Sequence, residues 1–216
     1  MKKTALIGAS GFVGSAILKE LLSRGYQVEA LVRNPDGLTV ENQNLSVKKV
    51  DVSDTTTLVS LLKGYDSVIS AYNPGWSNPD IYNLTLENYP RILEAAKKAG
   101  VKRLLIVGGA GTLFCASGLR VVDSGAIPDE IMGGVKSLGE FFLNTLIYEK
   151  SIDWVFFSPA GSLEPGSSTG VYRLGKDDLI VDSDGKSHIT VGDYAKAMVD
   201  ELERPVHHHE RFTIGY

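Results

Sequence analysis

The feature that most constrains this chain is a glycine-rich turn near its amino end. Residues 5–14 read Ala-Leu-Ile-Gly-Ala-Ser-Gly-Phe-Val-Gly, so an apolar run ends in three glycines spaced G-x-x-G-x-x-G. An amphipathic helical pattern begins directly afterwards. In a strand–turn–helix of this kind, Gly8 permits the tight turn, Gly11 lets a pyrophosphate approach the backbone, and Gly14 lets the helix lie close to the sheet.

This segment predicts a dinucleotide site rather than an ordinary turn between a strand and a helix. The N–H groups at a helix start have no partners inside the helix, and the helix dipole is positive there, so both attract phosphates. Glycines also collect in simple turns, but these three stand between a strand pattern and a helix pattern. The predicted phosphate loop consists of Gly8, Ser10, Gly11, Phe12, Val13 and Gly14.

Strand and helix patterns alternate through most of the chain. The predicted strands are residues 4–7, 27–32, 47–50, 67–71, 102–107 and 154–157, and the predicted helices are 12–23, 54–62, 81–99 and 129–148. This alternation is typical of the α/β class. It predicts a Rossmann-type, doubly wound parallel sheet with the strand order 3-2-1-4-5-6. We expect a single NAD(P)-binding domain over residues 1–216.

The last quarter departs from this alternation. Residues 158–170 are rich in Pro, Gly and Ser, and residues 171–184 are expected to form short strands around a turn. Thr190–Asp193 has the pattern of a capping box that opens a helix to about residue 202, and residues 211–215 are expected to form a closing strand. The irregular segments after the fifth and sixth strands lie at the ligand-binding edge of such sheets, so we expect them to form a substrate pocket.

The overall composition excludes several classes of function. A formal net charge of −4 gives no basic footprint for nucleic acid or an anionic membrane surface. No stretch approaches the roughly 20 apolar residues that span a bilayer. The single cysteine excludes an internal disulfide and suits a reducing compartment, so we expect a cytoplasmic protein that acts on a small molecule. A homo-oligomer is compatible with these properties.

We expect no metal site. His207, His208 and His209 resemble a metal-binding tract, but successive side chains of an extended segment point to opposite faces. We interpret them as a solvated loop. Cys115 has no Cys-x-x-Cys partner.

The residue after the second strand indicates which cofactor binds. Sites that prefer NAD usually carry an acid there, about 20 residues after the glycine turn, but this chain has Arg33. A guanidinium attracts and can bind a 2′-phosphate bidentately, and Ser10 can donate a further hydrogen bond. NADP is therefore preferred over NAD, although NAD remains possible if Arg33 is only a solvated residue at a strand end.

Residues after the third and fourth strands are expected to contact the adenosine half of the cofactor. Asp51 can accept from the exocyclic amine of adenine and the Val52 backbone can complete that edge, unless Asp51 is a loop acid or a cap. The fold leads the segment of Ala71, Tyr72 and Asn73 along the adenosine ribose.

Four segments carry a resemblance to a known family: residues 8–14 (GASGFVG), 30–34 (ALVRN), 107–113 (VGGAGTL) and 156–160 (FFSPA). The chain resembles the atypical short-chain dehydrogenase/reductases, the NAD(P)H-binding, NmrA-like group. Within it, the chain is similar to the small NADH-flavin reductases, which are akin to biliverdin reductase B. The resemblance covers essentially the whole chain and is specific for fold and cofactor, but not for the substrate.

The resemblance also implies where the nicotinamide lies. In this family the residues after the sixth strand flank the nicotinamide, which here are Pro159 and Ala160. Gly108, after the fifth strand, is expected to form the floor of the same pocket. Relatives that act on nucleotide sugars carry a larger substrate domain, for which this chain has no residues left. The loops near residues 108–128 and 158–190 must therefore build the pocket.

The sequence offers two candidate catalytic residues. Classical relatives use a Tyr-x-x-x-Lys pair on the helix after the fifth strand, where the lysine lowers the pKa of the tyrosine. Lys136 takes the lysine position, but Met132 stands where the tyrosine would be. Lys136 is thus an ordinary helix lysine, or else a proton donor or ribose ligand. Thr112 is a second candidate because it can hydrogen-bond a substrate carbonyl, although loop threonines usually cap backbone groups.

Three functions fit these residues. The leading hypothesis is an NAD(P)H-dependent reductase that transfers hydride to a flavin, a quinone or a similar conjugated acceptor, which can take its proton from water. A non-catalytic, NADP(H)-sensing regulator of NmrA type is the first alternative. An epimerase or dehydratase acting on a small substrate is the second, and it needs a base near the nicotinamide that the missing tyrosine does not supply.

The assignment of Arg33 generates the first prediction. We expect Arg33→Asp to weaken NADPH binding by about 1–3 kcal/mol, the scale of one lost charge-assisted contact. NADH binding should change much less because NADH lacks the 2′-phosphate. Calorimetric titration of the wild type and of Arg33→Asp with both nucleotides measures the difference. Equal losses for the two nucleotides would contradict the role of Arg33.

Overall fold

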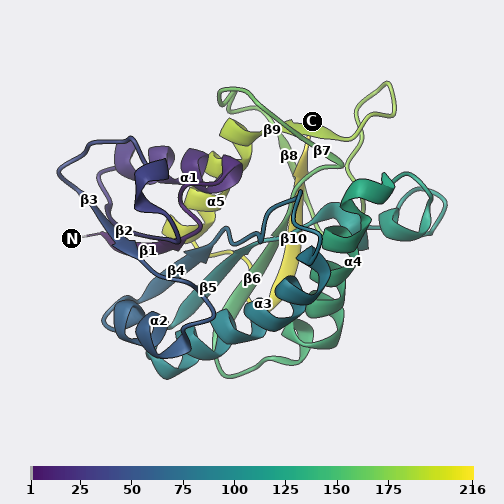
Figure 1. Ribbon diagram of the computed structural model, residues 1–216. Helices are drawn as coiled ribbons and strands as arrows, with labels where there is room; N and C mark the ends of the chain where they lie inside the picture. The colour runs from purple at the N-terminus through teal and green to yellow at the C-terminus, as the bar shows by residue number, and fades with distance from the viewer. Residues whose placement is uncertain (1) are drawn as a thin grey trace.

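A mostly parallel sheet forms the centre of the protein, whose computed structural model describes residues 2–216. The strand order is β3-β2-β1-β4-β5-β6-β10-β8, and β8 runs antiparallel to β10 (Figure 1). The central strands are nearly continuous apolar runs because helices cover both faces. The strands are β1 (Lys3–Ile7), β2 (Gln27–Val32), β3 (Leu45–Lys49), β4 (Ser67–Ser70), β5 (Arg103–Val107), β6 (Asp153–Ser158), β8 (Arg173–Gly175) and β10 (Glu210–Gly215).

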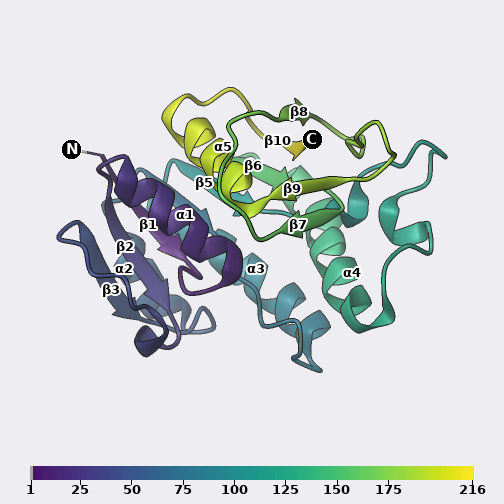
Figure 2. The same cartoon turned by 90° about the horizontal axis from the view of Figure 1, so that it is seen from above.

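Five α-helices pack on the two faces of the sheet. α1 (Phe12–Ser23) and α5 (Val191–Glu203) lie side by side on one face (Figure 2). α2 (Thr55–Leu62), α3 (Ile81–Lys98) and α4 (Asp129–Asn144) cover the other. Each face buries its own apolar cluster, and each fully buried large side chain stabilises the fold by about 1.5–3 kcal/mol. Among the described residues, no helix combines the length and apolarity that crossing a bilayer requires.

The structure confirms the predicted doubly wound sheet and the order of its first six strands. The predicted boundaries of these strands and helices agree to within one residue except in two places. β3 begins two residues earlier than predicted, because Leu45 already pairs with Val28 at the exposed edge of the sheet. α4 ends at Asn144, where Thr145 leaves the helical conformation, and a short 3₁₀ turn follows over Leu146–Tyr148.

The last quarter adds to the sheet instead of forming a separate hairpin. The expected pair of short strands in residues 171–184 is only half correct: β8 forms there, but its partner is β10. The free edge of β10 offers unpaired backbone groups, and β8 satisfies them. Two further short strands, β7 (Ser162–Glu164) and β9 (His188–Thr190), pair with each other beside the main sheet.

A buried carboxylate fixes the loop between β7 and β8. Thr190 caps α5 as predicted, because its hydroxyl accepts from the Asp193 N–H at 3.2 Å. The Asp193 carboxylate also accepts from Ser168 Oγ (2.6 Å), the Gly170 N–H (2.8 Å) and the Tyr216 hydroxyl (2.5 Å). Burial opposes ionisation, but these hydrogen bonds outweigh it and hold the pKa of Asp193 well below its ordinary value.

The histidine segment is only in part the solvated loop that we expected, because His208 is exposed while His207 and His209 are partly buried. His207 Nδ1 lies 2.8 Å from Glu201 Oε2, and its ring stacks on Phe212 with the centroids 4.2 Å apart. The His209 backbone N–H donates to the Trp154 carbonyl at 2.9 Å. These contacts hold the segment against the amino end of the sheet. No group of three or more His, Cys, Asp or Glu residues within residues 2–216 is arranged to hold a metal ion.

The Asp193 contacts generate the second prediction. We expect Asp193→Ala to lower the free energy of unfolding by about 3 kcal/mol, because the donors of residues 168–170 and the Tyr216 hydroxyl lose their buried, charged acceptor. For a chain of this size that corresponds to roughly 6–12 °C in Tm. A carboxylate whose pKa is lowered by folding contributes its full stabilisation above the pKa that the same group has in the unfolded chain. The difference between variant and wild type should therefore be constant above about pH 5 and shrink below about pH 4.

Asp184→Ala is the matched control, because this exposed turn residue makes no side-chain contact that would be lost. It should leave the unfolding free energy within about 0.5 kcal/mol. Chemical denaturation of the three proteins between pH 3 and pH 7 measures the effect. Equal stability of Asp193→Ala and Asp184→Ala would contradict the assigned role.

Candidate functional site

A cleft of about 240 Å³ opens at the carboxyl edge of the sheet. The strand ends are level there, because Ile7 pairs with Leu31 on one side and with Ser70 on the other. Eight of the predicted cofactor residues line the cleft: Gly8, Ser10, Gly11, Arg33, Val52, Ala71, Tyr72 and Asn73. The chain segments that follow four different strands thus meet at one site, as parallel topology requires.

Two of the three glycines of the turn are required by packing. Gly8 has a φ of +78°, and a Cβ there would lie 2.5 Å from the Ala71 carbonyl oxygen. A Cβ on Gly14 would lie 2.0 Å from the Gly8 carbonyl oxygen. Gly11 differs, because its Cβ would meet only that same oxygen at 3.5 Å, an ordinary contact. The protein itself does not need a glycine at position 11, so the open space there fits a group that approaches from the cleft.

The start of α1 is open to such a group. Gly11 is the N-cap, and no side chain caps the helix. The first helical N–H groups, on Phe12, Val13 and Gly14, therefore have no acceptor from a capping side chain. The geometry fits a pyrophosphate, whose oxygens can accept from these groups at the positive end of the helix dipole.

The predicted 2′-phosphate residues lie together at one end of the cleft. Arg33 is exposed and forms no ion pair with any residue in 2–216. Ser10 is also exposed, and its Cβ lies 3.8 Å from where a Cβ on Gly37 would be. Asn34, which sequence reasoning missed, lines the cleft as well. Its side-chain carbonyl accepts from the Asp36 N–H at 3.1 Å, so the hydrogens of its side-chain amide remain available as donors.

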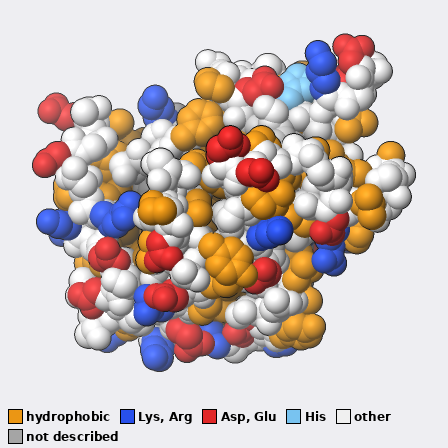
Figure 3. All heavy atoms as spheres, turned by 45° about the vertical axis from the view of Figure 1, so that its right-hand side comes forward, with side chains coloured by type: hydrophobic (Ala, Val, Ile, Leu, Met, Phe, Trp, Pro, Cys, Tyr) orange, Lys and Arg blue, Asp and Glu red, His pale blue; other side chains and the backbone are white. Residues whose placement is uncertain are grey.

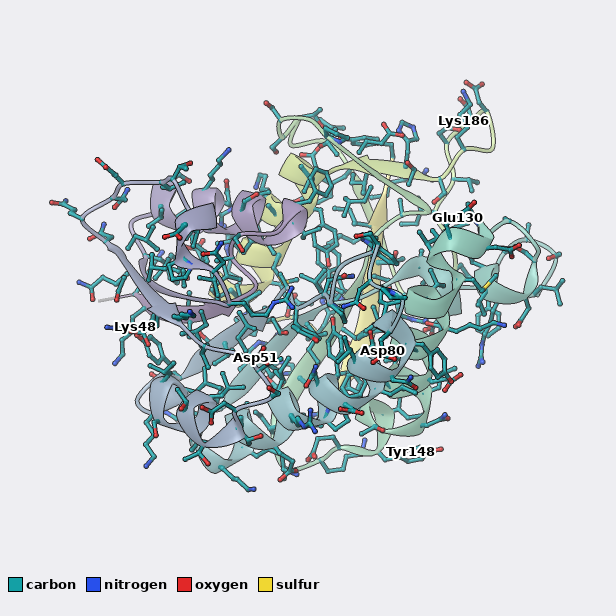
Figure 4. The ribbon with its side chains drawn as sticks, in the orientation of Figure 1. Lys48, Asp51, Asp80, Glu130, Tyr148 and Lys186 are labelled. Carbon is teal, nitrogen blue, oxygen red and sulfur yellow. The ribbon has the colours of Figure 1, made fainter. Side chains whose placement is uncertain are left out.

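Asp51 stands at the rim of the cleft rather than in its wall. Its neighbours Val50 and Val52 line the cleft, while Asp51 is exposed beside the sheet edge (Figure 4). Ser53 lowers the pKa of Asp51 through its side chain and its backbone N–H, and the positive charge of Arg33 lowers it further. The carboxylate is therefore a permanent acceptor at neutral pH.

Tyr72 is held by two residues of α3. Its backbone carbonyl accepts from the Tyr89 hydroxyl at 2.7 Å, and its own hydroxyl accepts from Asn88 Nδ2 at 2.8 Å. Burial raises the pKa of Tyr72, so its phenol stays protonated. The Asn73 side chain is held as that of Asn34 is, because its oxygen accepts from the Gly75 N–H at 2.7 Å, which leaves its amide hydrogens as donors.

The residues predicted at the nicotinamide end lie outside this cleft. Gly108 is packed against β6, since a Cβ there would meet the Phe156 ring at 2.6 Å. Pro159 is half-buried and Ala160 is buried after the end of β6. The two groups of predicted residues therefore occupy successive strand ends along one edge, β1 to β4 and then β5 to β6.

The two catalytic candidates differ in exposure. Lys136 is exposed on α4. Thr112 is only 4% exposed, and its Oγ1 accepts from an Arg211 guanidinium nitrogen at 2.7 Å. Arg211 Nε also donates to Asp177 at 2.9 Å. Thr112 therefore belongs to a buried contact between two loops and does not face the cleft.

The remaining lining residues are apolar. They were missed because they belong to the strands themselves, and their hydrophobicity is equally explained by the core. Strand-end position was the available signal, since three of the four directly precede a predicted site residue and Leu31 stands two residues before one. These residues are Ile7, Leu31, Val32 and Val50.

The molecular surface beyond the cleft is mixed in charge on one visible face. Figure 3 shows Lys and Arg side chains interspersed with Asp and Glu, and hydrophobic side chains between them. This face carries no extended patch of one charge. It therefore lacks the basic footprint that is typical of a nucleic-acid interface.

Comparisons of the sequence with known proteins agree with this geometry. The profile of a family described as NAD(P)H-binding matches residues 8–205. An uncharacterised protein of Bacillus subtilis strain 168, YwnB, is 40% identical over 215 residues, covering 98% of this chain and 97% of that protein.

Solved structures extend the similarity to the whole fold. A proposed epimerase from Bacteroides thetaiotaomicron is 60% identical with a TM-score of 0.94, covering 100% of this chain and 97% of the other. A proposed NADH-flavin reductase from Streptococcus pneumoniae TIGR4 is 32% identical with a TM-score of 0.84, covering 100% and 99%. These names belong to the similar proteins.

The different surroundings of the glycines generate the third prediction. Gly11→Ala should change the free energy of unfolding by about 1 kcal/mol or less, the cost of alanine at an N-cap, because its methyl group meets no close neighbour. It should nevertheless weaken NADPH binding at least tenfold by filling the space for the pyrophosphate. Thermal unfolding and calorimetric titration measure the two effects.

Gly14→Ala is the converse control. Its methyl group would collide with the Gly8 carbonyl, so this variant should lose several kcal/mol of stability. Full retention of NADPH affinity by Gly11→Ala would show that the open space at the turn is not the phosphate site.

Proposed function

The chain belongs to the NAD(P)H-binding family and has the Rossmann fold of the atypical short-chain dehydrogenase/reductases, and from that premise we propose that it is an NADPH-dependent reductase. Its acceptor is a flavin, a quinone or a similar conjugated molecule. One observation carries the proposal: an open glycine, an uncapped helix start and an exposed arginine converge on one cleft.

The preference for NADPH over NADH rests on the charge at the end of the cleft. Arg33 forms no ion pair within residues 2–216, and the Ser10 hydroxyl and the Asn34 amide can donate to the same anion. The residue directly after β2 is not an acid, so it does not repel a 2′-phosphate. The name of the pneumococcal protein specifies NADH and applies to that protein.

The choice of acceptor rests on the lack of a proton donor. When bound, the reduced nicotinamide supplies a hydride from C4, which a flavin or quinone accepts while water supplies the proton. The helix start and Arg33 bind the far end of the cofactor, and the loops after β5 and β6 orient its reactive end. Met132 replaces the tyrosine that protonates carbonyl substrates in classical relatives, so simple ketones are poor candidates.

The second candidate is an epimerase or dehydratase, which the name of the Bacteroides protein favours. Such a reaction oxidises and re-reduces the substrate, so it consumes no NADPH overall. It needs a base beside the nicotinamide. Thr112 is bonded to Arg211, so Lys136 is the candidate base that remains of the two predicted ones.

The test follows NADPH oxidation with flavin, quinone and simple ketone acceptors. We expect saturable turnover with flavins or quinones, none with ketones, and transfer of deuterium from 4-deuterated NADPH to the acceptor or its exchange into water. Lys136→Met should leave kcat within about twofold, because solvent supplies the proton.

Tight NADPH binding without turnover of any acceptor would contradict the reductase and support the NADP(H)-sensing alternative. Substrate isomerisation without net NADPH consumption, abolished by Lys136→Met, would support the epimerase instead. Binding of neither nucleotide would remove the premise of all three.

A further inference from the structure

A chain of hydrogen bonds reaches the cleft from the surface of α3. It consists of Arg91, Asn88 and Tyr72, in that order. Asn88 Oδ1 accepts from an Arg91 guanidinium nitrogen at 2.9 Å, and Asn88 Nδ2 donates to the Tyr72 hydroxyl at 2.8 Å. Asn88 is only 4% exposed, while Tyr72 lines the cleft.

The direction of every bond in this chain is fixed by chemistry. A guanidinium has donors and no acceptor, so the oxygen of the Asn88 amide must face Arg91. The NH₂ group of Asn88 must then face Tyr72, whose oxygen accepts. The hydroxyl proton of Tyr72 is consequently left to point elsewhere, and the described residues provide it with no acceptor.

The free proton lies at the adenosine end of the cleft. Tyr72 lines the same cleft as Arg33 and Val52, two of the residues predicted to contact the 2′-phosphate and the adenine. Arginine side chains cannot accept a hydrogen bond. Adenosine offers acceptors in its ring nitrogens and ribose oxygens, so it complements the donor.

We propose that the Tyr72 hydroxyl is a fixed hydrogen-bond donor to the adenosine half of the cofactor, and that Asn88 is the positioning residue that sets its direction. The inference rests on the proposed cofactor site but not on the identity of the acceptor. Asn88 does not touch the cofactor. It acts by holding the oxygen of Tyr72 as an acceptor, which leaves only the proton for the ligand.

The test is a double-mutant cycle. Tyr72→Phe removes the hydroxyl. Asn88→Asp keeps the shape and the contact with Arg91, but its carboxylate draws the Tyr72 proton away from the cleft. We expect each single variant to raise the Kd for NADPH and for adenosine 2′,5′-bisphosphate by about three- to tenfold, the scale of one hydrogen bond. The double variant should bind no more weakly than either single variant.

Two comparisons separate this role from other effects. Asn83→Asp adds the same charge to α3, near Asp80, and should leave both Kd values unchanged. If Asn88→Asp acted by repelling the phosphates or by disturbing the fold, its cost would persist in the Tyr72→Phe background. Additive losses, or an unchanged Kd in Asn88→Asp, would therefore overturn the inference.

The outcomes also separate this inference from the reductase activity. The expected cycle together with no reduced acceptor would support the Tyr72 role and contradict the reductase. Turnover of a flavin or quinone with no coupling between Tyr72 and Asn88 would support the reductase and contradict the Tyr72 role. If neither NADPH nor the bisphosphate bound to the wild-type protein, both proposals would be overturned.

Discussion

The cofactor cleft depends on the close approach of two backbone segments, the turn after β1 and the first turn of α1. Gly8 and Gly14 touch each other there, and Gly8 also touches the carbonyl of Ala71 after β4. Side chains at these positions would push the helix away from the strand ends. The contact places the open helix start level with the ends of β1, β2 and β4, and the cleft opens there.

Much of this arrangement is readable from the sequence because it depends on local patterns. The glycine spacing specifies the turn, and buried parallel strands are short apolar runs whose ends are marked by turn residues. Arg33 could be assigned because its position follows directly from the end of β2. The edge strand β3 was less well located, since half-exposed residues such as Leu45 carry a weaker pattern.

The parts that could not be predicted depend on side chains far apart in the chain. Thr112 is a reasonable catalytic candidate until it is seen to be buried, with its hydroxyl oxygen accepting from Arg211, 99 residues away. Asp193 reads as half of a capping box, yet its carboxylate bonds the loop at residues 168–170. Asn88 lies inside a helix pattern that gives no hint of its contact with Tyr72. Such partners are set by the folded structure, not by periodicity.

The bonds of Arg211 have a consequence for how related proteins diverge. One guanidinium links Thr112 in the loop after β5 with Asp177 beside β8, and backbone bonds from Phe114 to Asp177 and from Leu179 to Phe114 join the same two segments. The two loops therefore behave as one rigid wall. An insertion that enlarges one of them must be accommodated by the other, so evolutionary changes in this wall should occur in both segments together while the glycine turn stays the same.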